Sequence, residues 1–367
     1  MTLLTLLDEH RNLGGQMDDA DGIQRVLSYG DPEAEYRRLR ESVGLLDLSF
    51  RSRICAIGPD RLDFIHGQVT NDVRKLSVGE GCLAALVDAK GRVQSDLNIY
   101  RLKDELLLDF EAGLTSRVTE RLEKYIVAED VELVDVAPHY GLLSVQGPAS
   151  LEALSALNLT AEPPANDRQV AFESHAELGE IYVINRPRVG GYGFDLFVPT
   201  DNLATAFGKL HPACEKLNGA PCGWLALETA RIEAGIPRYG VDMDDSSLVS
   251  ETGIAQEAIS YSKGCYIGQE VIARIRTYGR AKRHFGTLRL ADDIETLPTK
   301  GDLLFNGDRK AGWITSSASS PHDGSNLALG YVERDSAEAG TKLELETASG
   351  RSVVSVTSTD AAKAAED

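Results

Sequence analysis

The chain has 367 residues, which is long enough for two or three domains that each bury a core of their own. Its 57 acidic and 38 basic side chains give a net charge of −19, so most of the surface repels phosphate groups. This balance argues against a general role on nucleic acid or on an anionic membrane, and we expect neither as a partner. A content of 42% hydrophobic and 26% charged residues is typical of an ordinary globular protein.

The number and spacing of the cysteines indicate whether metal sites or disulfide bonds are to be expected. Five cysteines without a CxxC pair favour neither a zinc ribbon nor a disulfide scaffold, so we predict no metal site and a reducing compartment. The first residues contain a short apolar run but lack a basic start and reach Asp8 and Glu9 at once, unlike a secretory signal. No stretch is long enough to span a bilayer, and we expect a cytoplasmic protein.

The first half of the chain alternates helical and strand patterns. Apolar residues at helical spacing follow Asp31, and Gly44 suits the position just after that helix. Thr115 is the expected N-cap of a later amphipathic helix. The predicted elements are helices over 33–44, 58–68 and 115–127, a hairpin of 82–87 and 92–102, and a strand over 131–136.

A second α+β passage begins near Tyr140, with strands and helices around a glycine-rich turn. Its predicted strands are 141–147, 180–185 and 194–198, and its later helices lie near 201–210 and 222–234. After Arg283 the pattern changes to six short alternating strands separated by turn signals, which indicates a small antiparallel barrel or sandwich.

These patterns predict an α+β fold with several parts. They are an N-terminal extension 1–30, an α+β region 31–283 made of approximately 31–138 and 139–283, a barrel 284–358 and a disordered tail 359–367. The boundary near residue 284 is the sharpest, and ligand sites favour such junctions.

A basic stretch, residues 263–284, stands just ahead of this boundary, with six Lys/Arg and one acid. Residues 268–276 predict a helix, and Cys265 lies just upstream of it and close to Lys263. A helix N-terminus and an amine both stabilise a thiolate, so the pattern favours a reactive sulfur. The alternative is that Cys265 packs as a small hydrophobe. The basic side chains either bind an anion or form a solvated face.

The segment "KGCYIGQE", residues 263–270, resembles the signature K-G-C-[FY]-x-G-Q-E of the YgfZ group of tetrahydrofolate-binding proteins, relatives of the glycine-cleavage T-protein, an aminomethyltransferase. "EYRRLRESVGLLDLS", "GQVTNDV", "DAKGRVQSDLNIY" and "RIEAGIPRYGVDM" resemble other parts of that family. The resemblance implies a T-protein-like arrangement of two α+β domains and a C-terminal β-barrel around a central folate pocket. It implies tetrahydrofolate as the cofactor, Cys265 as the functional residue, and iron–sulfur client or assembly proteins as partners.

The resemblance also singles out pocket residues. Strand alternation places Asp96 and Asn98 on one polar face, which otherwise is only a solvent-facing side. Alignment with the T-protein puts Asp96 near the reactive nitrogens of folate, where a carboxylate can assist proton transfer. The other expected cofactor contacts are Asn98, Tyr192, Arg231, Glu233, Lys263 and Arg274. If the folate carries a chain of glutamates, the side chains expected to grip it are Arg274, Arg276, Arg280 and Arg283.

Two departures from the T-protein pattern weaken the reading as an enzyme. Gly191 stands where that family has a glutamate that holds the pterin, and Leu107 stands where it has an aromatic side chain. We therefore predict a folate-dependent factor that assembles or repairs iron–sulfur clusters. The alternatives are a tetrahydrofolate-dependent aminomethyltransferase of a glycine-cleavage system and a binding module without chemistry.

Overall fold

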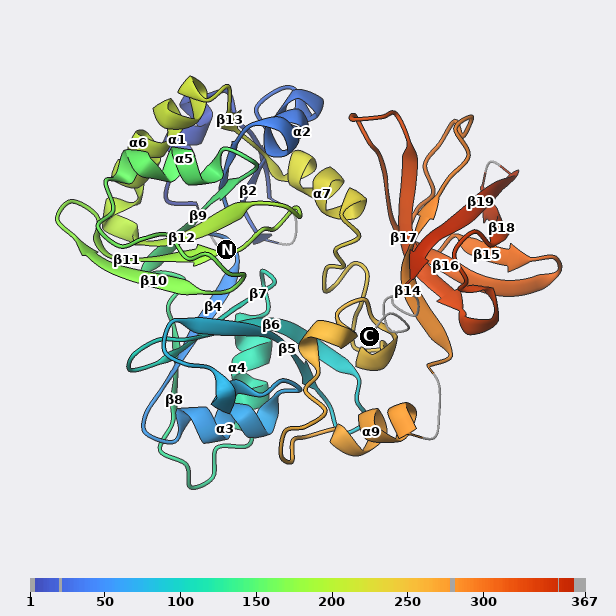
Figure 1. Ribbon diagram of the computed structural model, residues 1–367, viewed down its shortest axis with the longest axis horizontal. Helices are drawn as coiled ribbons and strands as arrows, with labels where there is room; N and C mark the ends of the chain where they lie inside the picture. The colour runs from blue at the N-terminus through green and yellow to red at the C-terminus, as the bar shows by residue number, and fades with distance from the viewer. Residues whose placement is uncertain (1–3, 20–21, 278–280, 349, 360–367) are drawn as a thin grey trace. The chain divides into compact units, whose positions relative to one another are not determined.

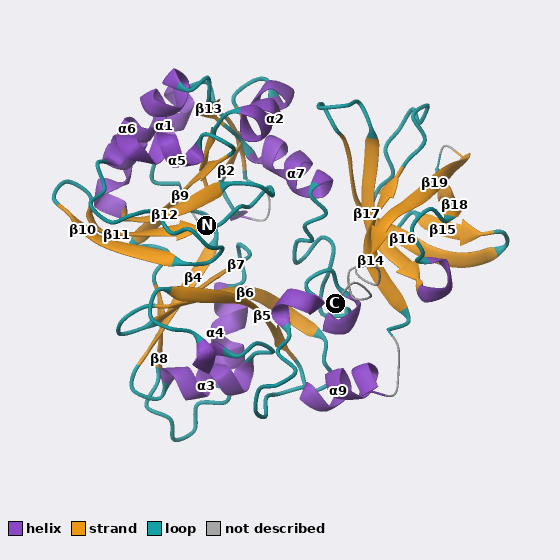
Figure 2. Cartoon of the chain, viewed as in Figure 1, coloured by secondary structure: helices purple, strands orange, loops and turns teal. Residues whose placement is uncertain are grey.

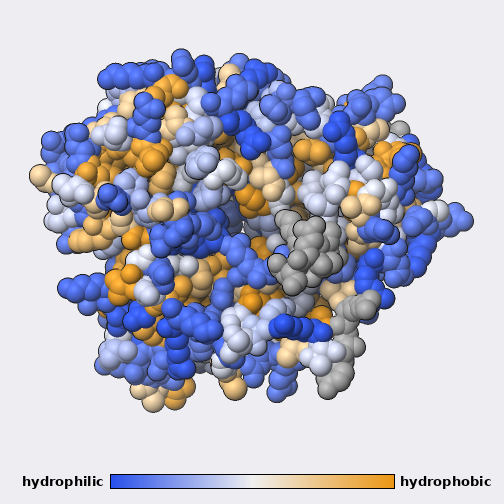
Figure 3. All heavy atoms as spheres, viewed as in Figure 1, coloured by the Kyte–Doolittle hydropathy of each residue, from blue (hydrophilic) through white to orange (hydrophobic). Residues whose placement is uncertain are grey.

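The computed structural model describes residues 4–19, 22–277, 281–348 and 350–359 (Figure 1). The chain divides into two compact units. Unit 1 comprises residues 1–66, 73–83 and 97–230, and unit 2 comprises residues 67–72, 84–96 and 231–367. Hydrophilic side chains cover most of the face seen in Figure 3, as the charge of the sequence leads one to expect. None of the described helices is long and apolar enough to cross a membrane.

Unit 1 contains a six-stranded sheet in the order β10-β11-β12-β9-β3-β13. Its neighbours pair antiparallel, except that β13 runs parallel to β3. Helices α5 and α6 pack on one face of it (Figure 2) and bury a leucine- and valine-rich core. The bounds are β3 Gly44–Asp47, β9 Tyr140–Gln146, β10 Val170–His175, β11 Gly179–Asn185, β12 Gly193–Pro199, β13 Ala220–Pro221, α5 Ser150–Leu154 and α6 Leu203–Lys216.

A second sheet has the order β5-β6-β7-β4-β8. Residues 80–83 of β5 and 97–101 of β6 belong to unit 1, whereas the turn end of this hairpin, residues 84–96, belongs to unit 2. Helix α4 packs against β4 and β8. The bounds are β4 Ser52–Ile57, β5 Glu80–Val87, β6 Val93–Arg101, β7 Leu106–Phe110, β8 Glu132–Asp135, α3 Arg61–Gln68 and α4 Thr115–Glu123.

The N-terminal part of unit 1 is folded into elements that the sequence patterns did not indicate. Helix α1, Leu7–Asn12, buries His10, whose ring centroid lies 5.4 Å from that of Phe207. Strands β1, Gln16–Asp18, and β2, Arg25–Ser28, form a two-stranded sheet ahead of α2, Pro32–Glu41.

Two local predictions were wrong for steric and capping reasons. Gly44 does not follow the end of α2 but opens β3, where an added Cβ would lie 2.4 Å from Cδ2 of Leu39. Glycine is therefore required there by close packing rather than by helix termination. Thr115 is the first residue of α4 and not its N-cap, which is Leu114 without a side-chain hydrogen bond.

Unit 2 contains a closed barrel in the order β14-β17-β16-β15-β18-β19, with antiparallel pairs throughout. The predicted antiparallel barrel is confirmed, because alternating strands bury every second side chain in its core. Its strands are β14 Arg283–Arg289, β15 Leu303–Asn306, β16 Arg309–Ser319, β17 Asn326–Glu333, β18 Lys342–Thr347 and β19 Gly350–Thr359. Of the predicted tail 359–367, Thr359 ends β19 and the rest lies outside the described residues.

Two helices and the end of a third precede the barrel in the chain. Helix α7, Trp224–Glu233, ends before Gly235, which has a φ of +70°, the left-handed conformation typical of a helix-terminating glycine. Helices α8, Ala255–Ala258, and α9, Gln269–Thr277, follow, and α9 confirms the helix predicted over 268–276.

Candidate functional site

Unit 1 holds a network of buried charges centred on Asp109 of β7, which is fully buried. Arg51 donates from Nε to Oδ1 of Asp109 at 2.8 Å and from Nη2 to Oδ2 at 3.2 Å. Arg188 donates from Nη2 to Oδ2 of the same carboxylate at 3.3 Å. The guanidinium groups of Arg51 and Arg188 thus share the carboxylate of Asp109.

The network continues from Arg188 to a second fully buried carboxylate, Asp195 of β12. Arg188 donates from Nε to both oxygens of Asp195 at 3.0 and 2.9 Å. Ser144 donates to Oδ1 of Asp195 at 2.7 Å, and Gln146 donates to the Ser144 hydroxyl at 2.9 Å. The polar groups on β9 and β12 therefore fix the orientation of Arg188.

These pairs set the protonation of the network. Although burial opposes ionisation of Asp109, the charges of Arg51 and Arg188 hold its pKa at about 2. Burial lowers the pKa of the fully buried Arg53 to about 10, while Asp109 acts in the opposite direction. Asp109 and Arg53 therefore remain charged at neutral pH.

Three side chains at this network have buried polar atoms without a hydrogen bond in the described part of the chain. They are Nε and Nη1 of Arg53, Nε of Arg186 and the hydroxyl of Tyr100. Arg53 uses its remaining nitrogen, Nη2, to donate to the carbonyls of Ser49 and Ala137 at 3.0 and 3.3 Å. Unsatisfied donors inside a protein are costly, so such atoms are candidates for contact with water or ligand.

Asn98 joins the same network through both ends of its amide. Its Nδ2 donates to Oδ2 of Asp109 at 3.3 Å, and its Oδ1 accepts from Nε of Arg168 at 3.1 Å. Asn98 is 3% exposed, so the alternative interpretation of this strand face as solvent-facing is wrong at Asn98. A buried polar side chain requires partners, and here the strands of unit 1 supply them.

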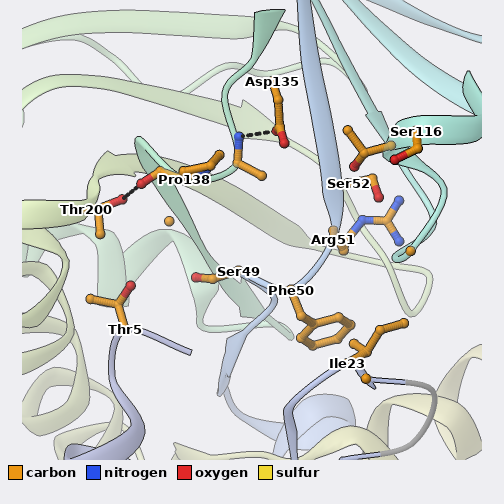
Figure 4. Close-up of a pocket in the computed structure, with 15 residues that line it drawn as sticks. Thr5, Ile23, Ser49, Phe50, Arg51, Ser52, Ser116, Asp135, Pro138 and Thr200 are labelled. Atoms are coloured by element: carbon orange, nitrogen blue, oxygen red, sulfur yellow. Dashed lines mark hydrogen bonds between the residues drawn. The ribbon is translucent and has the colours of Figure 1, made fainter. Parts of the chain in front are cut away.

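A polar cavity of about 600 Å³ lies in unit 1 at the edge of this network (Figure 4). Arg51 forms part of its wall, together with the hydroxyl residues Ser49 and Ser52 and the carboxylate residue Asp135. Two hydrogen bonds stiffen the rim, from the Thr200 hydroxyl to the carbonyl of Pro138 and from the amide of Ala137 to Asp135, each 3.0 Å long. The volume is in the range of small-ligand sites.

Asp96 lies in unit 2 on the turn half of the β5–β6 hairpin and is half-buried. The turn is well ordered by Asp88, whose Oδ1 accepts from the amides of Lys90 and Arg92 at 2.8 and 2.9 Å. The amide of Val93 donates to the carbonyl of Ser247 at 2.9 Å. The strand that carries Asp96 is thus held on its turn side by the Asp88 carboxylate and by the Ser247 carbonyl.

The signature loop, residues 263–270, is held mainly by backbone groups of unit 2. The ammonium of Lys263 donates to the carbonyls of Val69 and Asn71 at 2.6 and 2.9 Å and lies 4.7 Å from the ring centroid of Tyr266. Gly268 has a φ of +85°, and an added Cβ would lie 2.5 Å from the carbonyl oxygen of Asp88. These positions of the motif therefore have a structural role.

Cys265 is exposed in this loop, four residues ahead of the first residue of α9. The other cysteines are also free thiols, and three of them are buried. Burial raises the pKa of Cys214 to about 12, and burial also raises the pKa of Cys55 and Cys222. Only at Cys265, among the five, is the sulfur in an exposed residue, which leaves it open to reagents from solvent.

The other predicted contacts in unit 2 have partners of their own. Arg231 is 5% exposed and donates to Asp242 and, at 2.9 Å, to the Ser316 hydroxyl. The Ser320 hydroxyl donates to Glu233 at 2.9 Å. Arg274 is exposed on α9.

Beyond Arg274, two of the basic side chains that the structure describes have partners in unit 2. Arg276 lies over the ring of Tyr261 at 3.8 Å, and Arg283 pairs with Glu251 at 3.0 Å. Arg280 lies outside the described residues.

The glycine turn of unit 1 carries the remaining predicted residues. Gly191 has a φ of +77° with open space around an added Cβ, and Tyr192 is 69% exposed. Leu107 is 4% exposed and belongs to the apolar core of the unit.

Within the described ranges, no group of three His, Cys, Asp or Glu side chains is arranged to hold a metal ion.

Comparison with known proteins decides the family. The GCVT N-terminal domain matches residues 6–262, and the glycine cleavage T-protein C-terminal barrel domain matches residues 283–361. The chain belongs to the glycine cleavage T-protein family. Its fold matches the crystal structure of glycine cleavage system aminomethyltransferase T from Bartonella henselae, with a TM-score of 0.87 at 22% identity over 97% of this chain and 96% of that one.

Curated relatives in the T-protein family bear the name aminomethyltransferase. The protein from Symbiobacterium thermophilum is 30% identical over 351 residues, which cover 93% of this chain and 92% of the relative. The protein from Shouchella clausii is 28% identical over 344 residues, which cover the same shares of the two chains.

These relatives overturn the predicted function. The interpretation as an iron–sulfur assembly or repair factor, with iron–sulfur proteins as partners, is wrong: relatives that match along nearly the whole chain are named aminomethyltransferase. That prediction depended on the eight residues 263–270, several of which hold the loop in place, and on the departures at Gly191 and Leu107. The coarser prediction, a T-protein-like α+β fold with a C-terminal barrel, is confirmed.

Sequence reasoning missed the buried network, although a signal for it exists. Asp109 interrupts the apolar run "LLLDF", and Asp195 interrupts "GFDLFV". An acid inside a buried strand needs a charged or hydrogen-bonding partner, and arginine is the usual one. The sequence alone does not say which of its arginines supplies that partner.

Proposed function

We propose that this protein is a tetrahydrofolate-dependent aminomethyltransferase of the glycine-cleavage type. The observation that carries the proposal is the match to the T-protein family along both its N-terminal and barrel regions, together with relatives named aminomethyltransferase over more than nine-tenths of the chain. In the proposed reaction an aminomethyl group leaves a lipoyl sulfur, its carbon passes to tetrahydrofolate, and its amine is released as ammonia.

Asp96 is the proposed acid–base residue. A carboxylate beside the departing amine can hold and deliver the proton that the amine needs in order to leave. The hydrogen bonds of the hairpin turn, to the Asp88 carboxylate and the Ser247 carbonyl, support this role, because they hold the strand of Asp96 in one geometry. Cys265, which is exposed, is the second residue that we propose for a reactive role.

The test is ammonia release from an aminomethyl-lipoyl carrier protein, measured with and without tetrahydrofolate. The proposal predicts release that requires both tetrahydrofolate and this protein. Release that is independent of either would contradict it.

A second candidate function is tetrahydrofolate binding without turnover. It is favoured by the substitution of Gly191 and Leu107 for the expected glutamate and aromatic residue, and by the resemblance of residues 263–270 to the YgfZ group. Calorimetry with tetrahydrofolate separates the two functions. Binding without ammonia release would favour this second function, whereas binding with release would favour the first.

The folate is proposed to enter as a polyglutamate, with its glutamates near the exposed Arg274. Arginine forms bidentate hydrogen bonds with carboxylates, so each engaged glutamate adds affinity. Affinity for the pentaglutamate should exceed that for the monoglutamate at low salt, and the difference should shrink in Arg274→Gln. Equal affinities would contradict this part of the proposal.

The five free cysteines support a reducing compartment, and we propose the cytoplasm.

A further inference from the structure

A second cavity of unit 1, of about 610 Å³, has a composition unlike the polar cavity beside Arg51. Its wall is largely apolar and includes the side chains of Leu102, Val170, Phe172 and Tyr182. Carboxylate side chains, from Asp104, Glu105 and Glu180, join this apolar wall. The combination of aromatic rings with uncompensated acids is the composition of sites for organic cations.

The two aromatic residues are held side by side by the sheet. Phe172 of β10 lies directly opposite Tyr182 of β11 in the antiparallel register, and their ring centroids are 5.3 Å apart at an interplanar angle of 47°. Ser174 is opposite Glu180, so Glu180 shares the face of both rings one pair further along. Phe172 is 51% exposed, which is unusual for a large apolar side chain and leaves ring surface open for a ligand.

Two loops that also line the cavity are fixed by backbone hydrogen bonds. The amide of Leu102 donates to the carbonyl of Glu105 at 3.0 Å, which closes the turn between β6 and β7. The amide of Gly79 donates to the carbonyl of Arg101, and the amide of Val170 donates to the carbonyl of Gly79, both at 2.8 Å. The cavity is therefore formed before any ligand arrives, which reduces the entropy cost of binding.

The cavity combines the aromatic rings of Phe172 and Tyr182 with negatively charged side chains. Burial, followed by the charges of Tyr140, Glu105 and Glu180, raises the pKa of Tyr182 above its ordinary value, so its ring stays a neutral phenol at physiological pH. Within the described ranges none of the three carboxylates forms an ion pair, and Lys103 is the one basic side chain among the described residues of the wall. Three acids against one base leave an excess of negative charge for a bound cation to neutralise.

We propose that this cavity binds a small organic cation of the trimethylammonium class. A primary ammonium ion is strongly hydrated, and entry into a site with a largely apolar wall removes much of that hydration. A methylated ammonium ion needs no hydrogen-bond acceptor, and it gains from contact with ring faces and from the nearby carboxylates. The proposal uses residues outside the Asp109 network and the signature loop, and it does not depend on the proposed transferase activity.

The test compares choline with its neutral isostere, 3,3-dimethyl-1-butanol, by calorimetry and saturation-transfer NMR on the full chain. Saturable binding of choline, at least roughly tenfold tighter than that of the neutral alcohol, is the expected result, because the two differ only in charge. Equal affinities, or no saturable binding of choline, would overturn the proposal.

Variants locate the site. Phe172→Ala and Glu180→Gln should each weaken choline binding roughly three- to tenfold, and Lys103→Gln should tighten it, because it removes the competing positive charge. All three residues are exposed, so the fold should be retained, as circular dichroism can verify. Glu123→Gln, on the exposed end of α4, makes the same charge change elsewhere in unit 1 and should leave binding unchanged. If Glu123→Gln weakened binding as much as Glu180→Gln, the cation would be held by net charge rather than by this cavity.

Discussion

The Asp109 network and the signature loop are positioned by different physical means. In the network, side chains from strands far apart in the sequence neutralise one another, and Asp109 and Asp195 have no exposed surface. In the loop, a lysine donates to backbone carbonyls and Gly268 adopts a conformation that other residues avoid. Side-chain charge therefore positions the residues of the Asp109 network, and backbone geometry positions those of the signature loop. The loop leaves its cysteine exposed, whereas the network leaves its acids inaccessible.

The largest effect is expected from breaking the network. Asp109→Asn keeps the shape of the side chain but leaves Arg51 and Arg188 without their shared charge, so the free energy of unfolding should fall by about 3–5 kcal/mol. Urea unfolding followed by circular dichroism measures this. The matched control is Asp63→Asn, which breaks the exposed pair between Asp63 and Arg74 and should cost less than about 1 kcal/mol. Equal losses of unfolding free energy in the two variants would mean that burial of the network does not increase its contribution to stability.

Acid should weaken the network without any mutation. The pKa of Asp109 is depressed to about 2 in the folded protein, from an ordinary value of 3.8. Its contribution to stability is therefore complete above about pH 5 and is lost as the pH falls through 4 towards 2, by about 2 kcal/mol in total. The difference in unfolding free energy between wild type and Asp109→Asn should narrow by that amount on acidification. A difference independent of pH would contradict the assignment.

The signature loop should respond to backbone changes. Gly268→Ala introduces a Cβ at a positive φ and 2.5 Å from the carbonyl oxygen of Asp88, whereas Gly191→Ala has a similar φ and open space. In both variants the left-handed conformation should lower the free energy of unfolding by about 1 kcal/mol. In Gly268→Ala the clash should lower it by at least about 1 kcal/mol more. Thermal unfolding of the pair measures the difference. Equal melting temperatures would show that the loop is not pinned to the hairpin turn.

The smallest expected effect on stability is at Cys265, where the readout is reactivity. Cys265 should be alkylated first among the five thiols, because it is exposed while Cys55, Cys214 and Cys222 are buried with raised pKa values. Mass spectrometry of partially alkylated protein identifies the site. Cys265→Ser should remove the fast phase of alkylation and leave the unfolding free energy unchanged. Fast labelling of a buried cysteine would contradict the described packing.

Much of the fold follows from local patterns in the sequence. Alternating strands predicted the barrel, and amphipathic spacing predicted α2, α4 and α9, because each pattern depends on neighbours within a few residues. Strand β10 and the N-terminal elements were not predicted. Their apolar residues acquire a buried face only through pairing with β11 or contact with α6, which local spacing does not encode.

The candidate site was predictable only in part. The strand and turn pattern predicted the hairpin, whereas the role of Asp96 was implied only by the resemblance to the T-protein and stays a prediction. Arg51, Asp109 and Arg188 come together through the order of the strands, so no spacing in the sequence links them. The exposure of Cys265 was likewise left open, since it depends on how Lys263 and Gly268 hold the loop.

The most direct test of the proposed transferase compares wild type with Asp96→Asn in two assays on the same preparations: affinity for tetrahydrofolate and the rate of tetrahydrofolate-dependent ammonia release from an aminomethyl-lipoyl carrier. Loss of a positioned acid–base group lowers such rates by about 10²–10⁴-fold while binding changes little. We therefore predict a slow variant that still binds tetrahydrofolate. Undiminished ammonia release by Asp96→Asn, or none by the wild type, would contradict the account.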